Sequence, residues 1–213
     1  MWRVARADDA LQPSFLDPLD ESLATGGNRF HSTEHGTIYF ATKLDGCFAE
    51  TLARFRVKAS MLAALEADDD WQSRGFMPPG SVPADWRHRR VALRVAVDKT
   101  SRFLDAEAPE THVVLTEELA EELGDLGYDY LDVGVVRGRD RQITRLIAEW
   151  TFDAEDFSGE PAFAGVRYVS RHADFECWAL FDRTPVIELE RRAITHGMTG
   201  LQRMARRFGL VVH

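Results

Sequence analysis

The chain has 213 residues, 45% of them hydrophobic, which is enough for one well-buried core in a single domain over residues 1–213. Its 26 basic and 35 acidic residues give a net charge of −9, which disfavours direct, non-specific binding to nucleic acid. Neither a membrane span of ~18 apolar residues nor the apolar stretch of a signal peptide is present, which favours a cytoplasmic location without membrane contact.

The first half of the chain predicts a strand, a helix, a loop and a second strand, in that order. Phe48, Leu52 and Phe55 recur at helical spacing and indicate a helix from Gly46 toward Leu65. The strands are distinguished by β-branched residues and by apolar residues at every second position. They cover Thr37–Ala41 and Arg90–Val97, and the Pro- and Gly-containing excursion between helix and second strand covers 67–89.

The second half begins with a short predicted strand at Thr111–Leu115, after which Thr116 is expected to cap a helix that carries Glu117 and Glu118 in its first turn. A third helix is marked by Ile143, Leu146, Ile147 and Trp150. Strands are then predicted at Gly165–Ser170, at Glu176–Phe181 and, more weakly, at Pro185–Leu189, followed by a helix from Leu201 to Phe208 that Gly209 ends.

Strands and helices do not alternate regularly along this order, so a doubly wound parallel sheet is not predicted. The sequence instead favours an α+β domain with mainly antiparallel strands flanked by helices. Cys47 and Cys177 are far apart and have no CxxC or His-rich neighbourhood, which predicts a reduced chain without a zinc site. The histidines also lack metal-ligand spacing, so no metal is expected.

Three residues in the first quarter of the chain suit a nucleotide site. Arg29 follows the turn-forming stretch 25–28, where a guanidinium can fork onto a pyrophosphate or a ribose hydroxyl. Tyr39 lies on the opposite strand face from Ile38 and Phe40, so its ring can stack on a flat nicotinamide while its hydroxyl stays in water. Taken singly, Arg29 also fits a solvated loop and Tyr39 an ordinary strand aromatic.

Glu50 projects away from the apolar stripe of its predicted helix, by about 200° from Phe48 at the helical 100° per residue. A carboxylate there can stabilise a cationic sugar, but a surface pair with Arg54 explains the same position. Ser170 closes a strand just before Arg171, where its hydroxyl can reach a phosphate or ribose. A serine at a strand end also serves turn formation alone.

The stretches around these residues together resemble the RES domain family, which is named for an arginine, a glutamate and a serine. The family residues correspond to Arg29, Glu50 and Ser170, and a family tyrosine ahead of the glutamate corresponds to Tyr39. The stretches are Asn28-Arg-Phe-His-Ser32, Gly36-Thr-Ile-Tyr-Phe-Ala41, Phe48-Ala-Glu-Thr-Leu52 and Gly165-Val-Arg-Tyr-Val-Ser-Arg171. The motif-bearing core covers about residues 25–185. Phe30-His31 departs from the Trp/Tyr-Asn expected of the family.

The resemblance implies a bacterial toxin that consumes NAD as substrate, with a fold similar to the ADP-ribosyltransferase toxins and no permanently bound cofactor. It implies cleavage of the nicotinamide–ribose bond by phosphorolysis, with inorganic phosphate as co-substrate, or by hydrolysis, and inhibition by a cognate antitoxin in trans. Arg29, Tyr39, Glu50 and Ser170 would be catalytic, and His31, Ser32 and Arg171 would join Arg29 and Tyr39 in binding NAD. Two alternatives stay open: transfer of ADP-ribose to a protein, and a catalytically idle module that senses NAD.

Overall fold

The structure, a computed structural model, describes residues 1–66 and 75–213. A seven-stranded sheet in the order β5-β6-β7-β2-β1-β4-β8 forms its centre, with β5–β6 parallel and the other neighbouring pairs antiparallel. Its strands are β1 (Trp2–Arg6), β2 (Thr37–Ala41), β4 (Arg90–Ala96), β5 (Leu104–Asp105), β6 (Gly165–Val169), β7 (Glu176–Phe181) and β8 (Ile187–Ala193). The predicted α+β class with mainly antiparallel strands is confirmed.

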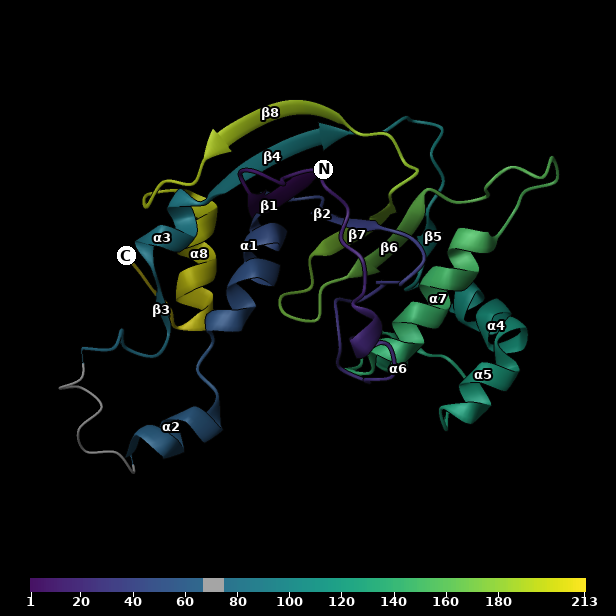
Figure 1. The fold of residues 1–213 in the computed structure, drawn as a ribbon, viewed down its shortest axis with the longest axis horizontal. Coiled ribbons are helices and arrows are strands. Elements are labelled where there is room, and N and C mark those ends of the chain that lie inside the picture. Colours follow the sequence, from purple (N-terminus) through teal and green to yellow (C-terminus); the bar gives the residue numbers. More distant parts are fainter. Residues whose placement is uncertain (67–74) are drawn as a thin grey trace.

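The sheet is nearly divided between β1 and β2. These strands pair at one position, Trp2 opposite Ala41, whereas β2 pairs with β7 along its whole length and β1 does the same with β4. The side chain of Arg3 crosses the division: its Nη1 donates to the carbonyl of Tyr39 at 3.1 Å and its Nε donates to that of Ala10 at 2.8 Å. The sheet therefore consists of two halves, β5-β6-β7-β2 and β1-β4-β8, joined at a narrow point (Figure 1).

Each half of the sheet carries its own helices (Figure 1). Beside β1 and β4 lie α1 (Leu44–Leu52), α3 (Ala84–His88) and α8 (Thr199–Phe208), and a small parallel pair, β3 (Ser81–Val82) with β9 (Val211–Val212). Beside β5 and β6 lie α4 (Pro109–Glu118), α5 (Ala120–Asp125), α6 (Val133–Val136) and α7 (Arg141–Asp153). The chain between α1 and β3 holds a 3-10 turn, Ala53–Phe55, and α2 (Ala59–Glu66). No helix among the described residues has the length and apolar character needed to cross a bilayer.

Where an apolar repeat extends over several residues of the sequence, the residues that it predicts to be buried are in the core. Phe48 and Leu52 of α1 are fully buried. Ile143 and Ile147 of α7 are at most 1% exposed. The strands predicted at 37–41, 90–97, 165–170 and 176–181 correspond to β2, β4, β6 and β7. The last predicted helix is α8, and Gly209 ends it in the left-handed conformation with φ 66°, as expected.

Two predictions in the middle of the chain are wrong. Residues 111–115 are helical, because Pro109 begins α4 and the buried residues His112 and Leu115 follow at helical spacing while Val113 and Val114 are exposed. Thr116 lies inside α4, where its hydroxyl donates to the carbonyl of His112 at 2.7 Å instead of capping a new helix.

The helix predicted from Gly46 toward Leu65 is interrupted. Regular helix ends at Leu52, and the following turn lets Phe55 pack edge-on against Trp86, with the ring centroids 6.1 Å apart. Within the 67–89 excursion, residues 67–74 lie outside the described residues, and the remainder includes β3 and α3. The weak strand predicted at 185–189 begins later, as the edge strand β8.

Gly165, the first residue of β6, holds a conformation and a packing position that only glycine fits. Its φ is +155°, and a Cβ built there would lie 2.1 Å from the carbonyl oxygen of Ala179 in the neighbouring strand β7. We expect Gly165→Ala to lower the free energy of unfolding by about 3 kcal/mol or more, because strain and a backbone clash add. Gly124→Ala in α5, which meets nothing within 4 Å, should raise it by about 0.5–1 kcal/mol. Urea unfolding measures both, and equal effects would contradict this account of Gly165.

Candidate functional site

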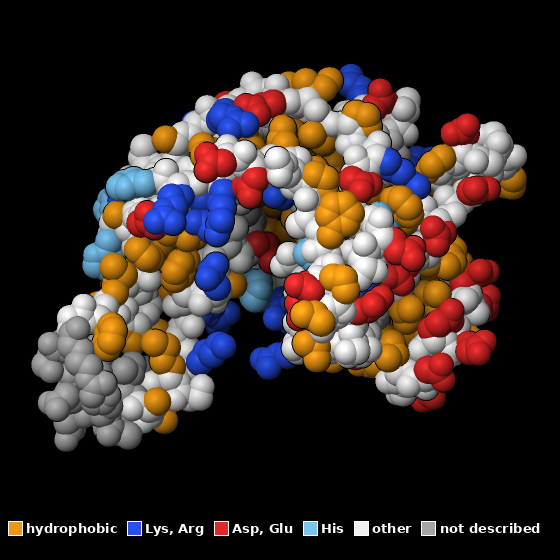
Figure 2. Space-filling model, viewed as in Figure 1, with side chains coloured by type: hydrophobic (Ala, Val, Ile, Leu, Met, Phe, Trp, Pro, Cys, Tyr) orange, Lys and Arg blue, Asp and Glu red, His pale blue; other side chains and the backbone are white. Residues whose placement is uncertain are grey.

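One cavity brings together side chains from both halves of the fold. It has a volume of about 430 Å³, and Arg29, Tyr39, Glu50 and Arg171 are all on its surface. Five arginines line it, together with one carboxylate, that of Glu50; we call it the arginine pocket, and its cations are Arg29, Arg54, Arg90, Arg141 and Arg171. Figure 2 shows that the molecule is hollowed between its two parts and that Lys and Arg side chains stand on both walls.

Arg29 is held rigidly although it lies in a loop. It is 7% exposed; its Nη2 donates to the carbonyl of Val136 at 2.9 Å, at the end of α6, and its Nη1 donates to that of Val169 at 3.2 Å. The guanidinium also lies over the ring of Tyr168, 4.8 Å from its centroid. Its Nε has no hydrogen-bond partner among the described residues. Burial lowers the pKa of Arg29, which nonetheless stays a cation.

A partly buried ion pair between Glu107 and Arg137 supports this arrangement. Glu107 accepts hydrogen bonds from the backbone N–H of Val169 at 2.9 Å and from Nε of Arg137 at 2.8 Å. This bond fixes Val169 at the end of β6, so that its carbonyl stays in position to accept the hydrogen bond from Arg29. The position of the Arg29 guanidinium therefore depends on β6 and α6, and not on the loop that carries it.

Tyr39 does not keep its hydroxyl in water, which corrects the sequence prediction. The hydroxyl donates to the backbone carbonyl of Arg29, so the tyrosine ties β2 to the loop that precedes it. Burial raises the pKa of Tyr39 well above its ordinary value, and the phenol stays protonated at neutral pH. Its half-buried ring remains on the surface of the arginine pocket and of a second cavity beside it.

Glu50 is directed into the cavity because Phe48 and Leu52 hold the opposite face of α1 in the core. The alternative pair with Arg54 is not formed: no ion pair joins Glu50 to another residue in the described ranges 1–66 and 75–213. Both side chains instead line the arginine pocket. Glu50 supplies the one carboxylate on a cavity surface that five arginines line.

Ser170, His31 and Ser32 do not line the arginine pocket. Ser170 is fully buried, and its hydroxyl accepts a hydrogen bond from the backbone N–H of His172 at 3.1 Å. It thus shapes the turn that presents Arg171 and His172 to the cavity. Ser32 is also fully buried and accepts from the N–H of Glu34 at 3.1 Å. These serines are placed to support the site.

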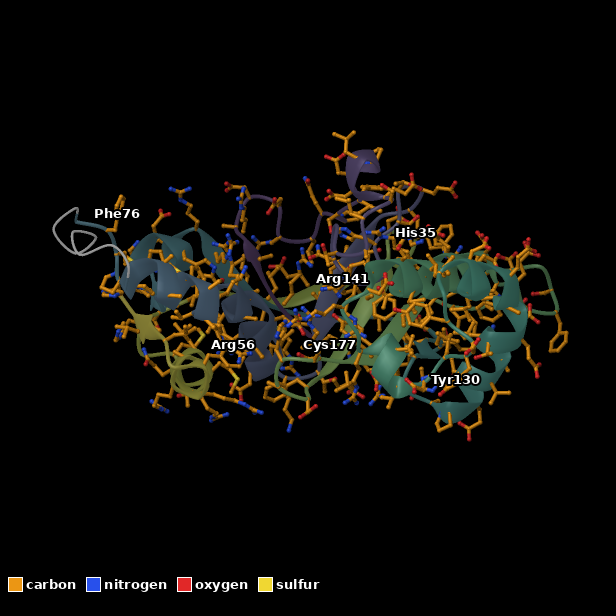
Figure 3. All side chains as sticks on the ribbon, turned by 90° about the horizontal axis from the view of Figure 1, so that it is seen from below. His35, Arg56, Phe76, Tyr130, Arg141 and Cys177 are labelled. Carbon is orange, nitrogen blue, oxygen red and sulfur yellow. The ribbon has the colours of Figure 1, made fainter. Side chains whose placement is uncertain are left out.

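Several cavity residues are not identified from the sequence. Arg141 is the first residue of α7, and its Nη1 is buried with no hydrogen-bond partner among the described residues. Burial, and then the cations Arg171 and Arg29, lower the pKa of Arg141 to about 10. Figure 3 labels Arg141 near the middle of the molecule, close to where the two parts meet. Tyr168 and His172 also line the cavity, but nothing in their local sequence separates them from ordinary strand and turn residues.

The chemistry of the cavity follows from this set of groups. Clustered guanidinium groups bind phosphates in a fixed, forked geometry, and tyrosine rings offer flat walls to a base or a pyridine ring. One carboxylate among them can stabilise positive charge that develops on a sugar. Across the described part of the chain, no group of three or more His, Cys, Asp or Glu side chains is arranged to hold a metal ion.

His31 packs beside Tyr39, with the ring centroids 5.7 Å apart. It is 4% exposed, and its Nε2 lies 2.8 Å from the hydroxyl oxygen of Ser14. Burial, and then the cation of Arg145, lower the pKa of His31 to about 4, so the folded protein holds it neutral.

We therefore expect acid to destabilise the fold through His31. The unfolded chain takes up this proton near pH 6.5, whereas the folded chain resists it down to about pH 4, so stability is lost as pH falls between those values. Between pH 7 and pH 5 this amounts to about 2 kcal/mol. Chemical unfolding at both pH values should show this loss in the wild type and a smaller one in His31→Gln. His88 is exposed and offers a control, because His88→Gln should show the same loss of stability as the wild type. An equal loss in all three proteins would contradict the assignment of the acid effect to His31.

Comparison with known proteins identifies the family. The sequence model of the RES domain matches residues 1–199. Among solved structures, the fold is similar to a chain of the crystal structure of the M. tuberculosis MbcT–MbcA toxin–antitoxin complex. The TM-score is 0.50 and the identity 13%, over 96% of this chain and 87% of that chain, which shows a likeness of fold. No curated protein matches the chain. Because the family match extends over far more than half of the sequence, the protein belongs to the RES domain family.

Proposed function

We propose that this protein is a toxin that cleaves the nicotinamide–ribose bond of NAD. The observation that carries the proposal is the arginine pocket, in which Arg29 and Glu50, from separate parts of the fold, line the same cavity with two tyrosine rings. NAD needs each of these features, since it has two phosphates, flat rings and a ribose that becomes cationic during cleavage. Membership of the RES domain family supports the same substrate.

Cleavage needs little help at the leaving group, because the nicotinamide ring of NAD is already cationic. When the bond between ribose C1 and the ring nitrogen breaks, the electron pair goes to the ring and the positive charge moves to the sugar, as in glycoside cleavage. In our proposal the carboxylate of Glu50 stabilises this charge, and Arg29 fixes the phosphates or the ribose. Tyr39 and Tyr168 contact the rings. Ser170 acts indirectly, by holding the turn that carries Arg171.

The number of arginines in the pocket favours inorganic phosphate, over water, as the group that accepts ADP-ribose. Two phosphates of NAD carry two negative charges, whereas five arginines face the cavity. The surplus suits an inorganic phosphate, whose oxygen attacks C1 of the ribose and yields ADP-ribose 1-phosphate and free nicotinamide. If water attacks instead, the products are ADP-ribose, nicotinamide and a proton. In either reaction the arginines keep the anionic part of the substrate in place while the bond breaks.

We further propose that a cognate antitoxin restrains the protein in trans, in the cytoplasm, where NAD is available. The solved complex of similar fold is a toxin–antitoxin complex, which supports a partner of this kind. An exposed cavity rich in arginine also suits a partner that presents acidic groups. Such a partner would prevent NAD from entering without any change in the catalytic side chains.

Glu50→Gln removes the charge but keeps the size of the side chain. We expect the rate of nicotinamide release from NAD to fall by about 10²–10³-fold, as for other preorganised electrostatic groups, with the melting temperature unchanged. Glu117→Gln, on the exposed face of α4, is the matched control and should keep the wild-type rate. Expression of the wild type, but not of Glu50→Gln, should deplete NAD and arrest growth. A wild-type rate in Glu50→Gln would remove Glu50 from the mechanism.

The reaction products show whether phosphate, water or a protein side chain attacks the ribose of NAD. Purified protein is incubated with NAD, with and without inorganic phosphate, and the products are separated by chromatography. We expect phosphate to accelerate nicotinamide release and to appear in ADP-ribose 1-phosphate, because the arginine pocket has room and charge for it. ADP-ribose at the same rate in both samples would show hydrolysis instead. Label transferred from NAD to a protein would show ADP-ribosyl transfer.

A further inference from the structure

Another cavity lies along α7, and none of the residues on its surface lines the arginine pocket. Its volume is about 660 Å³, and its walls come from α7, from the junction of α4 and α5, and from residues 154–163. It continues into a smaller cavity of about 260 Å³, with which it shares Glu122, Leu146 and Glu149. We call the two cavities together the acidic groove.

The floor of the acidic groove is apolar. Ile143 and Ile147 hold one side of α7 in the core, whereas Leu146 and Trp150 line the groove one helical turn apart and are half-buried. Phe163, also half-buried, adds a second aromatic ring to the same surface. Large apolar side chains on a second side of a helix are typical of a helix that another element covers. The floor therefore has the composition of a contact surface.

The rim of the acidic groove consists of carboxylates without counter-charges. Those on the larger cavity are Glu122, Glu149, Asp153 and Glu155. In residues 1–66 and 75–213, no ion pair joins any of the four to a Lys, Arg or His side chain. Arg145 lines the smaller cavity, but its Nη groups donate to three backbone carbonyls, those of Glu21, Leu23 and Gly26.

This rim is the centre of a larger negative region. Residues 107–160 contain 15 Asp and Glu against 4 Lys and Arg, an excess that is larger than the net charge of −9 of the whole chain. Figure 2 shows Asp and Glu side chains gathered over the part that holds α4, α5 and α7, with hydrophobic atoms between them. Burial, and then the nearby carboxylate of Glu34, raise the pKa of Glu149. A cation bound here would relieve both costs.

We propose that the acidic groove binds a basic amphipathic helix of a partner protein. The apolar face of that helix lies on Leu146, Trp150 and Phe163, and its Lys and Arg side chains meet the carboxylates of the rim. Proteins commonly recognise an amphipathic helix in this way, by an apolar groove with charges along its edges. The inference goes beyond the proposed function, because a partner held in this groove leaves the arginine pocket open.

The cationic surfaces of the protein itself do not supply such a helix, so a second copy of the chain is not the occupant. The exposed residues of α8 are all polar and cannot cover an apolar floor; they are Thr199, Arg203, Arg206 and Arg207. On β8, Arg191 and Arg192 already pair with Glu188 and Glu190. Nucleic acid and anionic lipid carry the wrong charge for the rim.

The first test uses the wild-type protein and a synthetic probe. The probe is a fluorescein-labelled helix of about 18 residues, with Leu on one face at i, i+4 and i+7 spacing and Lys elsewhere. Its control has the same residues in an order that spreads Leu around the helix. In titrations of ¹⁵N-labelled protein, we expect the probe to shift the indole signal of Trp150 and the amides of Leu146 and Glu149. Shifts confined to exposed acidic residues of α4, such as Glu110 and Glu117, would overturn the proposal, as would equal affinity for the control peptide.

The second test reverses charge on the two walls of the groove. Glu122 and Asp153 are exposed, and we expect the double variant Glu122→Lys, Asp153→Lys to bind the probe about tenfold more weakly, measured by fluorescence anisotropy. The matched control is Glu110→Lys, Glu117→Lys, which changes the net charge equally on exposed positions outside the groove and should stay within about twofold of the wild type. Equal weakening in both double variants would show attraction by net charge alone and overturn the proposal.

The third test fills the groove and keeps every charge. Ala162 lines the groove, so Ala162→Trp should cover its floor and weaken binding of the probe by about tenfold, whereas Ala120→Trp, at an exposed position of α5 outside the groove, should not. Wild-type affinity in a folded Ala162→Trp would overturn the proposal. Melting temperatures identify a variant that does not fold, and the titration of the wild type then decides. All binding is measured without NAD, so these results stand whether or not the protein cleaves it.

Discussion

The site depends on the single pairing position between β1 and β2. A continuous ladder would seal the middle of the sheet, because paired strands lie only about 4.8 Å apart. Here the ladder stops after Trp2 and Ala41, and the guanidinium of Arg3 on β1 spans the gap with a bond to the carbonyl of Tyr39 on β2. The sheet stays joined, yet it leaves an opening beside α1 that Glu50 can face.

Electrostatics impose the second constraint. Five arginines around one cavity repel one another, and burial adds a desolvation cost for Arg29 and Arg141. The chain as a whole is acidic, at −9, so this local excess of positive charge is a feature of the cavity and not of the composition. Backbone carbonyls at the ends of α6 and β6 offset part of the cost at Arg29. A bound dianion would offset the rest, which is the physical reason to regard the arrangement as a binding site.

Much of this architecture is visible in the sequence, and the exceptions have physical reasons. Long apolar periods predict β2, β4, α7 and α8, and the short motifs predict Arg29, Tyr39 and Glu50 as site residues; the structure places all three on one cavity. Residues 111–115 mislead because β-branched residues suggest a strand, whereas Pro109 and the burial of the following turns make a helix. β1 is missed because Arg3 and Arg6 interrupt its apolar pattern, although Arg3 is needed at the division of the sheet.

The remaining site residues could not be predicted from local patterns. Arg141 looks like any cation at the start of an amphipathic helix, and its role arises only because α7 begins beside Arg29 and Arg171. Ser170 illustrates the reverse case: the motif marks it, but its hydroxyl bonds to the backbone of its own turn. Arg141 acquires its role through Arg29, more than a hundred positions away in the sequence, and no sequence period reports on such a contact.

The narrow joint in the sheet also has a mechanical consequence. Glu50 belongs to the half that carries α8, whereas Arg29 is anchored to α6 and β6 in the other half. A molecule that binds both side chains therefore acts as a brace between two bodies that share few backbone bonds. Occupancy of the cavity by such a molecule and resistance of the whole chain to unfolding are thereby coupled, so that the protein is most stable when a ligand of this kind is abundant.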